Sequence, residues 1–351
     1  MTTRNVWLDV LRAAAVVAVV AYHVVQQSPV SRSALAAITH YGQYGVDLFF
    51  ALSGWLIGTL FWKEYQAWGD VQLWRFWCRR AIRTVPPYLV ALLASWVAVY
   101  HARSEPFDLG YLIFIQNYYR HIPFFLVSWS LCVEEQFYVI APLLSLMLAA
   151  ALGLRRLPFA YLALLASPSL LRFFEYTSAT DGQFGYGTTA THLHMDGLIA
   201  GFGLSFLALH HPALIAHVIA RRAISAAVLI GCFVVVERQD SAIRYVLLPT
   251  VLALLFCLTI AAGVENDSAH ARNRGRFDGV VRSIAVAAYS AYLVHPLAIH
   301  AVVAIAVKLD PWPRAWYWPV VAVAITGSTL SFWWLIERPS IHIRDIVAPR
   351  R

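Results

Sequence analysis

Long runs of apolar residues, separated by short polar stretches, recur along the whole chain. A helix needs about 20 apolar residues to cross the hydrocarbon core of a bilayer. About ten runs are this long, and we expect membrane-spanning helices near residues 8–27, 44–63, 86–101, 125–150, 158–174, 192–210, 221–237, 244–263, 281–307 and 316–337. The pattern therefore predicts an all-α integral membrane protein, a bundle of about ten transmembrane helices.

The composition excludes a soluble globular protein. Of 351 residues, 60% are hydrophobic and only 13% are charged, with a mean hydropathy of +0.62. Apolar surface would remain after a single core was filled. We expect one membrane domain over residues 1–351, with a motif-bearing core at 8–339 and a basic cytoplasmic tail at 340–351. The first apolar run carries Asp9, Arg12 and His23, so a cleavable signal peptide is not expected.

Lysine and arginine are concentrated in alternate polar segments, on the same side as the two termini. The positive-inside rule therefore places both termini in the cytoplasm. We predict a multi-pass protein of the cell (inner, cytoplasmic) membrane. The formal net charge of +8 is then mainly a topology signal, and nucleic acid is not an expected partner. The four cysteines lack the paired spacing of a disulfide framework or a metal site.

Two ionisable residues interrupt the first apolar run. Arg12 and His23 lie eleven positions apart, so on a helix they share one face about 16 Å apart along the axis. An isolated charge in hydrocarbon costs on the order of 3 kcal/mol or more. Both side chains should therefore face protein or water. They are either a functional pair or a core histidine with an arginine near the membrane edge.

Further acids and imidazoles gather in the outer half of the expected spans. They are Asp47, Glu134, Glu135, His192, His194 and Asp196. Histidine suits general-base chemistry because its ordinary pKa lies near working pH. His192 and Asp196 share a helical face and could bind a metal, but we favour a role in shaping an acceptor pocket beneath the polar loop Tyr176–Ala190 and predict no metal.

The inner edge carries an arginine cluster of Arg75, Arg79, Arg80 and Arg83, just before Pro86 and Pro87. We expect the two prolines in the first turn of the third span, where an amide has no partner to lose. Arginine forks bind phosphate by bidentate hydrogen bonds. The cluster is therefore either an ordinary topology signal or a site for a phosphorylated donor.

Seven stretches in order along the chain resemble one known family, membrane-bound acyltransferase family 3. LDVLRAAAVVAVVAYH is similar to its LD-x-LR-x10-H opening, and SWSLCVEEQFYVIAP carries its W-S-L-x-x-E-x-x-F-Y signature. The other stretches are GVDLFFALSGWLI, RRAIRTVPPY, THLHMDGLIAG, AYSAYLVHPL and IERP. The matches extend from Leu8 to Pro339, nearly the whole chain.

Two residues depart from the family pattern. Ala13 replaces the glycine that usually follows the motif arginine, and His194 stands where the family usually has arginine. An anion contact at His194 would therefore depend on pH. No hydrolase domain of the SGNH type follows the last span in this sequence, so we expect the membrane unit to complete the transfer alone or with a partner.

The resemblance implies acyl transfer, for which we expect acetyl, from cytoplasmic acyl-CoA to a hydroxyl of a sugar, a glycan or a glycosylated small molecule. Acyl-CoA, expected to be acetyl-CoA, is then a donor substrate, and no cofactor is bound permanently. The Arg79, Arg80 and Arg83 side chains would hold the CoA phosphates. His23 would deprotonate the acceptor, with Glu134 orienting the imidazole. Arg12 would bind the donor or polarise its carbonyl.

Other residues of the matching stretches are expected to line the substrate site: Asp47, Ser53, Trp129, Ser130, Tyr138, His192, Asp196 and His295. Among them Ser53, Ser130 and Tyr138 are candidate donors to the developing oxyanion. His295 either lines the donor path or makes a hydrogen bond between helices. Gly54 and Gly58, with Ser53, could let helices approach closely.

Two classes of function follow from these observations. The first is the membrane O-acyltransferase. The second is a multi-span transporter or exporter that uses the same intramembrane charges as a path for substrate or protons. Release of CoA thiol that requires an acceptor distinguishes the enzyme.

Overall fold

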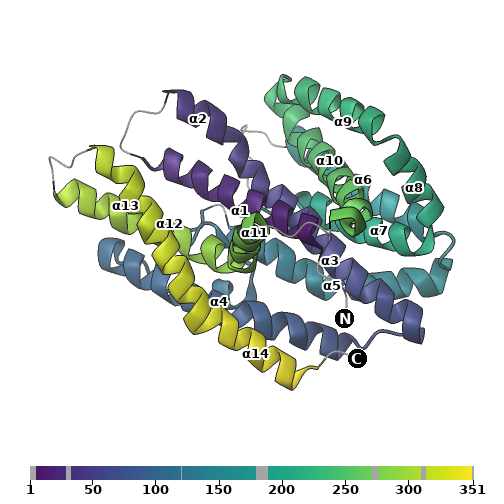
Figure 1. The fold of residues 1–351 in the computed structure, drawn as a ribbon, viewed down its shortest axis with the longest axis horizontal. Coiled ribbons are helices and arrows are strands. Elements are labelled where there is room, and N and C mark those ends of the chain that lie inside the picture. Colours follow the sequence, from purple (N-terminus) through teal and green to yellow (C-terminus); the bar gives the residue numbers. More distant parts are fainter. Residues whose placement is uncertain are drawn as a thin grey trace.

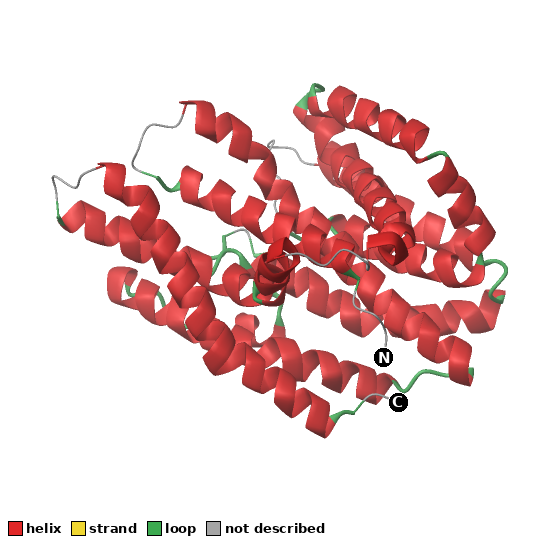
Figure 2. Cartoon of the chain, viewed as in Figure 1, coloured by secondary structure: helices red, strands yellow, loops and turns green. Residues whose placement is uncertain are grey.

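The computed structural model describes residues 5–28, 33–119, 121–178, 189–270, 276–309 and 314–349, and all regular elements in these ranges are helical (Figure 2). The helices are α1 (Val6–Gln26), α2 (Ser33–Thr39), η1 (His40–Tyr44), α3 (Gly45–Trp68), α4 (Leu73–Arg103), η2 (Leu109–Ile113), η3 (Gln116–Tyr118), α5 (Ser128–Leu152), α6 (Leu157–Ser178), η4 (Thr191–Leu193), α7 (Asp196–His210), α8 (Pro212–Ala220), α9 (Arg222–Glu237), α10 (Ser241–His270), α11 (Arg276–Val286), α12 (Ala288–Lys308), α13 (Arg314–Phe332), the π-helical turn η5 (Trp333–Glu337) and α14 (Arg338–Val347).

The number of possible spans is smaller than expected. Within the described ranges, eight helices are long and apolar enough to cross a membrane, and the pair α7 and α8, bent by 110°, would supply a ninth. The expected span at 221–237 corresponds to α9, which has only 16 residues. The expected span at 281–307 is divided at Ala287 into α11 and α12. The predicted helical multi-pass fold is therefore confirmed, whereas the predicted count of ten membrane-spanning helices is not.

The start of α4 also differs from the prediction. The helix begins at Leu73, so Pro86 and Pro87 lie in its interior and not in its first turn. Transmembrane helices tolerate such prolines because neighbouring groups satisfy the freed carbonyls. The whole arginine cluster is therefore helical, and Arg80 and Arg83 are neighbours on one face.

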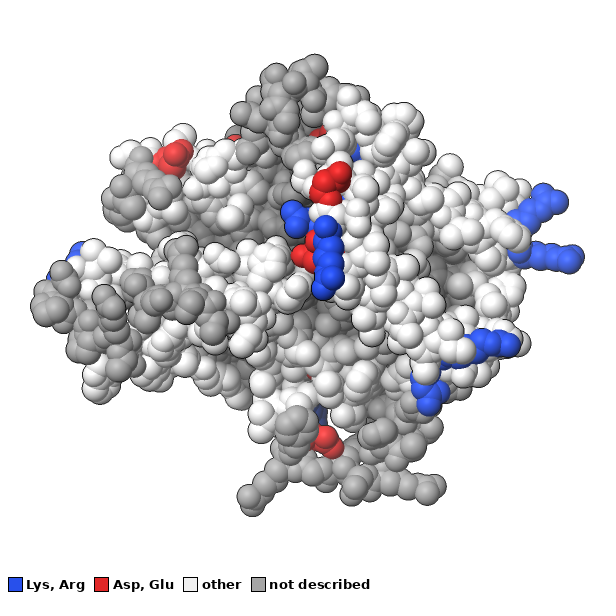
Figure 3. All heavy atoms as spheres, turned by 90° about the horizontal axis from the view of Figure 1, so that it is seen from above, with Lys and Arg blue, Asp and Glu red and all other residues white. Residues whose placement is uncertain are grey.

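The surface of the bundle suits a lipid environment. Large apolar side chains on several helices are strongly exposed, among them Trp74 at 78% and Val323 at 73%. The face shown in Figure 3 is largely uncharged, with its charged side chains in small clusters. Residues 179–188 of the expected outer loop Tyr176–Ala190 lie outside the described residues.

The helices α3 and α7 form the closest packing in the bundle (Figure 1). An added Cβ at Gly54 of α3 would lie 2.2 Å from the Leu198 carbonyl oxygen, and one at Gly58 would lie 2.1 Å from Ser205 Oγ. In return, an added Cβ at Gly201 of α7 would lie 2.2 Å from the Ala51 carbonyl oxygen. The expected packing role of Gly54 and Gly58 is confirmed.

Replacing Gly201 by alanine is expected to destabilise the protein by about 1–3 kcal/mol, because the helix backbones must move apart. The matched control is Gly327→Ala in α13, where an added Cβ meets no atom within 4 Å. That change should be neutral or stabilise by up to about 1 kcal/mol. Thermal unfolding in detergent measures both variants, and equal midpoints would contradict the close packing.

Candidate active site

The centre of the candidate site is a pair of histidines from α1 and α12. His23 Nδ1 lies 3.0 Å from His295 Nε2, and the two rings stack with centroids 5.0 Å apart. His295 is fully buried, whereas His23 remains partly exposed. The interhelical hydrogen bond expected as one alternative for His295 is therefore present, and its partner is His23.

The hydrogen bonds determine which nitrogen of each neutral ring carries the proton. His295 Nδ1 lies 3.0 Å from the Ala291 carbonyl oxygen, which can only accept. His295 Nε2 is then the unprotonated nitrogen and accepts from His23 Nδ1. This leaves the lone pair of His23 on Nε2. The pair thus presents one imidazole as a proton acceptor, held by a second imidazole.

Glu134 does not occupy the position expected for it. Its carboxylate accepts hydrogen bonds of 2.9 Å from Ser53 Oγ of α3 and of 2.9 Å from the Tyr138 hydroxyl, one turn along α5. The ring of Tyr138 lies under the Arg80 guanidinium, 5.1 Å from its centroid. The structure thus gives Glu134 the partners Ser53 and Tyr138, and it gives the His23 imidazole the partner His295 in the place predicted for Glu134.

The arginine cluster divides into two groups. Arg79 binds Asp345 Oδ1 of α14 at 3.1 Å and the Ala348 carbonyl oxygen, so its guanidinium holds the C-terminal helix and not an open site. Arg75 similarly binds Glu64 at 2.6 Å. Arg80 and Arg83 interact instead with the acids of α5, and all these side chains stay partly exposed. Of the three expected phosphate ligands, only these two remain available.

A buried carboxylate behind the arginines was not singled out from the sequence. Glu337 lies in η5 and is fully buried. Its Oε2 accepts from Ser290 Oγ at 2.5 Å and from the Ser290 amide at 3.2 Å, and the carboxylate interacts electrostatically with Arg83. The nearby Tyr289 hydroxyl donates to the Thr84 carbonyl at 2.8 Å. The matching stretches AYSAYLVHPL and IERP contain these residues and were the available signal.

Asp47 and His194 form a second polar contact. His194 Nε2 lies 3.1 Å from Asp47 Oδ1, and the Trp129 ring packs edge-on against the imidazole. His194 lies in the turn between η4 and α7, outside the candidate spans. Burial lowers the pKa of His194, but the hydrogen bond and the charge of Asp47 outweigh it, so the pKa is raised overall. This favours a charged His194.

Asp196 is committed to a buried ion pair with Arg172 of α6. The guanidinium binds both carboxylate oxygens, at 2.8 and 2.9 Å, and the two side chains are only 1% and 2% exposed. Arg172 also donates to the Leu193 and Val246 carbonyls. Asp196 is therefore held in this ion pair and, unlike His192, does not line the nearby cavity, so the acceptor-pocket role predicted for it stays a prediction. A lone arginine in an apolar helix was the signal for this pair.

His192 lies apart from the histidine pair. Its ring stacks on Tyr118, and both residues line a cavity of about 200 Å³ between α5, α6 and α7. Gln136 of α5 also lines this cavity, two positions after Glu134, so the cavity and the Glu134 contacts lie on different faces of α5. The structure does not bring His192 together with His23.

Ser130 and Arg12 have local partners. Ser130 is buried, and its Oγ lies 2.5 Å from the Tyr292 hydroxyl, a contact that joins α5 to α12. It is therefore not directed into an open site. Arg12 is partly exposed and pairs with Asp9 one turn earlier, at 3.8 Å. Within the described residues, no three His, Cys, Asp or Glu side chains are grouped as metal ligands would be.

Comparison with known proteins gives one family. A family model described as "Acyltransferase domain" matches residues 5–338. A Staphylococcus aureus (strain COL) protein named "Putative O-acetyltransferase" is 31% identical over 218 residues, 57% of this chain and 34% of that protein. The "Peptidoglycan O-acetyltransferase OatA" of Listeria monocytogenes is 32% identical over 155 residues, 38% of this chain and 23% of that protein. The matches thus span about a third or less of these relatives. No solved structure matches the chain.

Proposed function

Because the chain belongs to the acyltransferase family whose model matches residues 5–338, we propose that it moves an acetyl group from acetyl-CoA to a hydroxyl of a sugar, a glycan or a glycosylated small molecule. The protein is a multi-pass membrane acyltransferase, and we place it in the inner membrane of the cell. Membership of an enzyme family removes the support for the transporter alternative.

The observation that supports the proposal best is the histidine pair. His23 Nε2 carries a free lone pair because His23 Nδ1 donates to His295. In the proposed step, the acceptor hydroxyl gives its proton to His23 Nε2 while its oxygen attacks the thioester carbonyl. The C–S bond then breaks, and the CoA thiolate leaves with a proton from the imidazolium. His295 holds the tautomer and stabilises the imidazolium, as an orienting group does in a triad.

Arg80 and Arg83 are the proposed donor ligands. Their guanidinium groups remain partly exposed, and fork-shaped donors match phosphate oxygens. Glu134 and Tyr138 would hold Arg80 in place, since Arg80 lies over the Tyr138 ring. Acyl-CoA is then a substrate, and we expect no permanently bound cofactor. Arg12 is proposed to bind the donor at a point away from the thioester carbonyl, because about three turns of α1 separate it from His23.

The acceptor is proposed from the chemistry and from the relatives. A Listeria monocytogenes relative is named as a peptidoglycan O-acetyltransferase, and Staphylococcus aureus relatives are named as an O-acetyltransferase or a "Putative O-acetyltransferase". A hydroxyl is also the group that an imidazole base activates toward a thioester. We therefore assign a glycosidic hydroxyl as the acceptor class here.

Acceptor-dependent release of free CoA thiol tests the proposed function. Purified protein in detergent is given acetyl-CoA with and without a panel of soluble glycosides and muropeptides, and thiol is measured over time. We expect thiol release only with a suitable hydroxyl, together with one acetyl increment on that compound by mass spectrometry. Thiol release at the same rate without any acceptor would contradict transfer.

Replacing Arg83 by alanine is expected to raise the KM for acetyl-CoA roughly tenfold, because a charge-assisted contact to phosphate is lost. Arg79→Ala is the matched control in the same helix, since Arg79 binds α14. It should leave the KM for acetyl-CoA unchanged. Steady-state kinetics at saturating acceptor measure both KM values. An equal rise in the KM for acetyl-CoA in the two variants would contradict the proposal that Arg83 binds the donor while Arg79 holds α14.

A further inference from the structure

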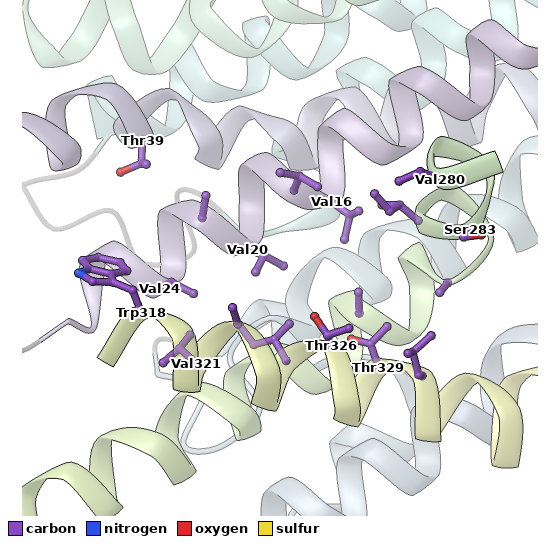
Figure 4. A pocket seen from close by; sticks show the side chains of 18 of the residues that line it. Val16, Val20, Val24, Thr39, Val280, Ser283, Trp318, Val321, Thr326 and Thr329 are labelled. Carbon is purple, nitrogen blue, oxygen red and sulfur yellow. The ribbon is translucent and has the colours of Figure 1, made fainter. Parts of the chain in front are cut away.

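A large groove lies beside the segments of α1 and α12 that carry the histidine pair, although neither histidine itself lines it. It has a volume of about 960 Å³ and lies between α1 and α13, with residues of α2, α11 and α12 completing its walls (Figure 4). Val16, Val20 and Val24 of α1 face Val321 and Thr326 of α13 across it. The groove therefore follows about two turns of α1, which correspond to about 12 Å.

The lining is suited to an uncharged chain. None of the residues that line the groove is charged, and the polar ones are hydroxyl side chains and Trp318. The groove lies between helices that are candidate membrane spans, and in such a setting an apolar volume of this size is filled by hydrocarbon rather than by water. A CoA phosphate has no partner here, because its charge would be buried without compensation.

The groove borders the candidate active site through α12. Ala287 and Ala291 line the groove, whereas Tyr292 points the other way and contacts Ser130. His295 follows Ala291 by one turn and binds its carbonyl. On α1, His23 lies between the groove residues Val20 and Val24 in the sequence. The histidine pair thus lies between the groove and the polar cluster of α4 and α5.

This arrangement separates two substrates. The arginines that suit the donor phosphates are on the far side of α12, where Tyr289 contacts Thr84 of α4. The groove is on the near side and carries no charge. A chain lying along Val16, Val20 and Val24 would bring a polar headgroup at its end close to His23. The geometry therefore leaves the groove to the acceptor.

We propose that the groove binds the hydrocarbon chain of a membrane-anchored acceptor, so that the hydroxyl that receives the acyl group is carried on a lipid-linked sugar. This inference rests on the proposed function and narrows its acceptor to compounds with a long apolar chain. The lipid anchor keeps the hydroxyl at the His23 end of the groove, and the headgroup supplies the attacking oxygen.

Photolabelling tests the binding part without any turnover. The probe is a long-chain alkyl glucoside with a diazirine in its chain, added to the full-length protein in vesicles of phosphatidylglycerol and phosphatidylethanolamine. We expect saturable labelling of the peptides that contain Val16–Val25 and residues 318–330. Excess unlabelled long-chain glucoside should compete, whereas methyl glucoside and further phospholipid should not. Labelling that never saturates, or that phospholipid displaces equally, would mean that bulk lipid fills the groove and would overturn the proposal.

Two matched variants locate the site. Ala322 lines the groove, whereas the next residue, Val323, does not and is 73% exposed. Ala322→Trp should remove the saturable labelling, and Val323→Trp should leave it intact. If Ala322→Trp fails to fold, Ala21→Trp fills the same groove from α1. Equal labelling of a folded groove variant and Val323→Trp contradicts the proposed site.

Turnover then links the groove to the reaction. The wild type should prefer the long-chain glucoside over methyl glucoside in kcat/KM, and Ala322→Trp should reduce this preference by about tenfold, the size of a lost pocket contact. A preference for chain length in the acyl donor in place of the acceptor would overturn the assignment. If no glucoside is acetylated by any variant, the proposed function fails for this acceptor class, while the labelling result still decides whether the groove binds the chain.

Discussion

Replacing His23 by alanine is expected to lower acceptor-dependent transfer by about 10²–10⁴-fold, the usual contribution of a positioned general base. The ring is the partly exposed member of the histidine pair, and its free Nε2 is the proposed proton acceptor. Loss of the imidazole removes that acceptor without removing the arginines on α4. The KM for acetyl-CoA should therefore change little while kcat falls.

A control on the same helix separates chemistry from folding. Ala14→Val alters an exposed side chain of α1 that lines neither the histidine pair nor the groove, and it should retain normal transfer. His295→Gln keeps a group that can accept from His23 Nδ1, so it should retain more activity than His295→Leu, which removes the acceptor. Full turnover by a correctly folded His23→Ala protein would exclude His23 as the base.

Replacing Arg172 by leucine is expected to destabilise the protein by about 3–5 kcal/mol, because Asp196 is left as an uncompensated buried charge. Both side chains are almost completely buried, and the guanidinium binds both carboxylate oxygens as well as backbone carbonyls. The midpoint of thermal unfolding in detergent should fall clearly, with loss of protein from the membrane fraction at higher temperature.

The control for this variant is Arg156→Leu, in the exposed turn before α6. That change should stay within about 0.5 kcal/mol of the wild type. The double variant Arg172→Leu with Asp196→Leu should recover part of the loss, because no charge then remains buried without a partner. Equal stability of Arg172→Leu and Arg156→Leu would show that the ion pair contributes little to folding.

The helical fold was predictable because apolar runs in a membrane protein report spans directly. The boundaries were not, since hydropathy alone does not detect a break such as Ala287 between α11 and α12. Hydropathy also does not show that α4 begins 13 residues before Pro86, because the arginines near its start are typical of a polar loop at the inner membrane edge. These polar turns are helical because α14 and α5 supply partners for them.

The sequence predicted many residues of the candidate site, but it did not predict which of them contact one another. His23 and His295 were both singled out, but their contact joins residues 272 positions apart, and no local pattern predicts such a contact. Glu134 seemed the natural partner for an imidazole, yet Ser53 and Tyr138 take its oxygens. Arg172 was missed because its partner Asp196 lies on another helix, and a single sequence does not pair distant charges.

The most direct test is a single-turnover transfer of a labelled acetyl group by the purified wild-type protein. Acetyl-CoA with a carbon-13 acetyl group is mixed with excess enzyme and a glycosidic acceptor, and the products are followed by mass spectrometry. We expect label to enter the acceptor hydroxyl in step with the release of CoA thiol, and we expect His23→Ala to slow both by about 10²–10⁴-fold. Thiol released without label on the acceptor, or transfer by His23→Ala at the wild-type rate, would contradict the proposed role of His23.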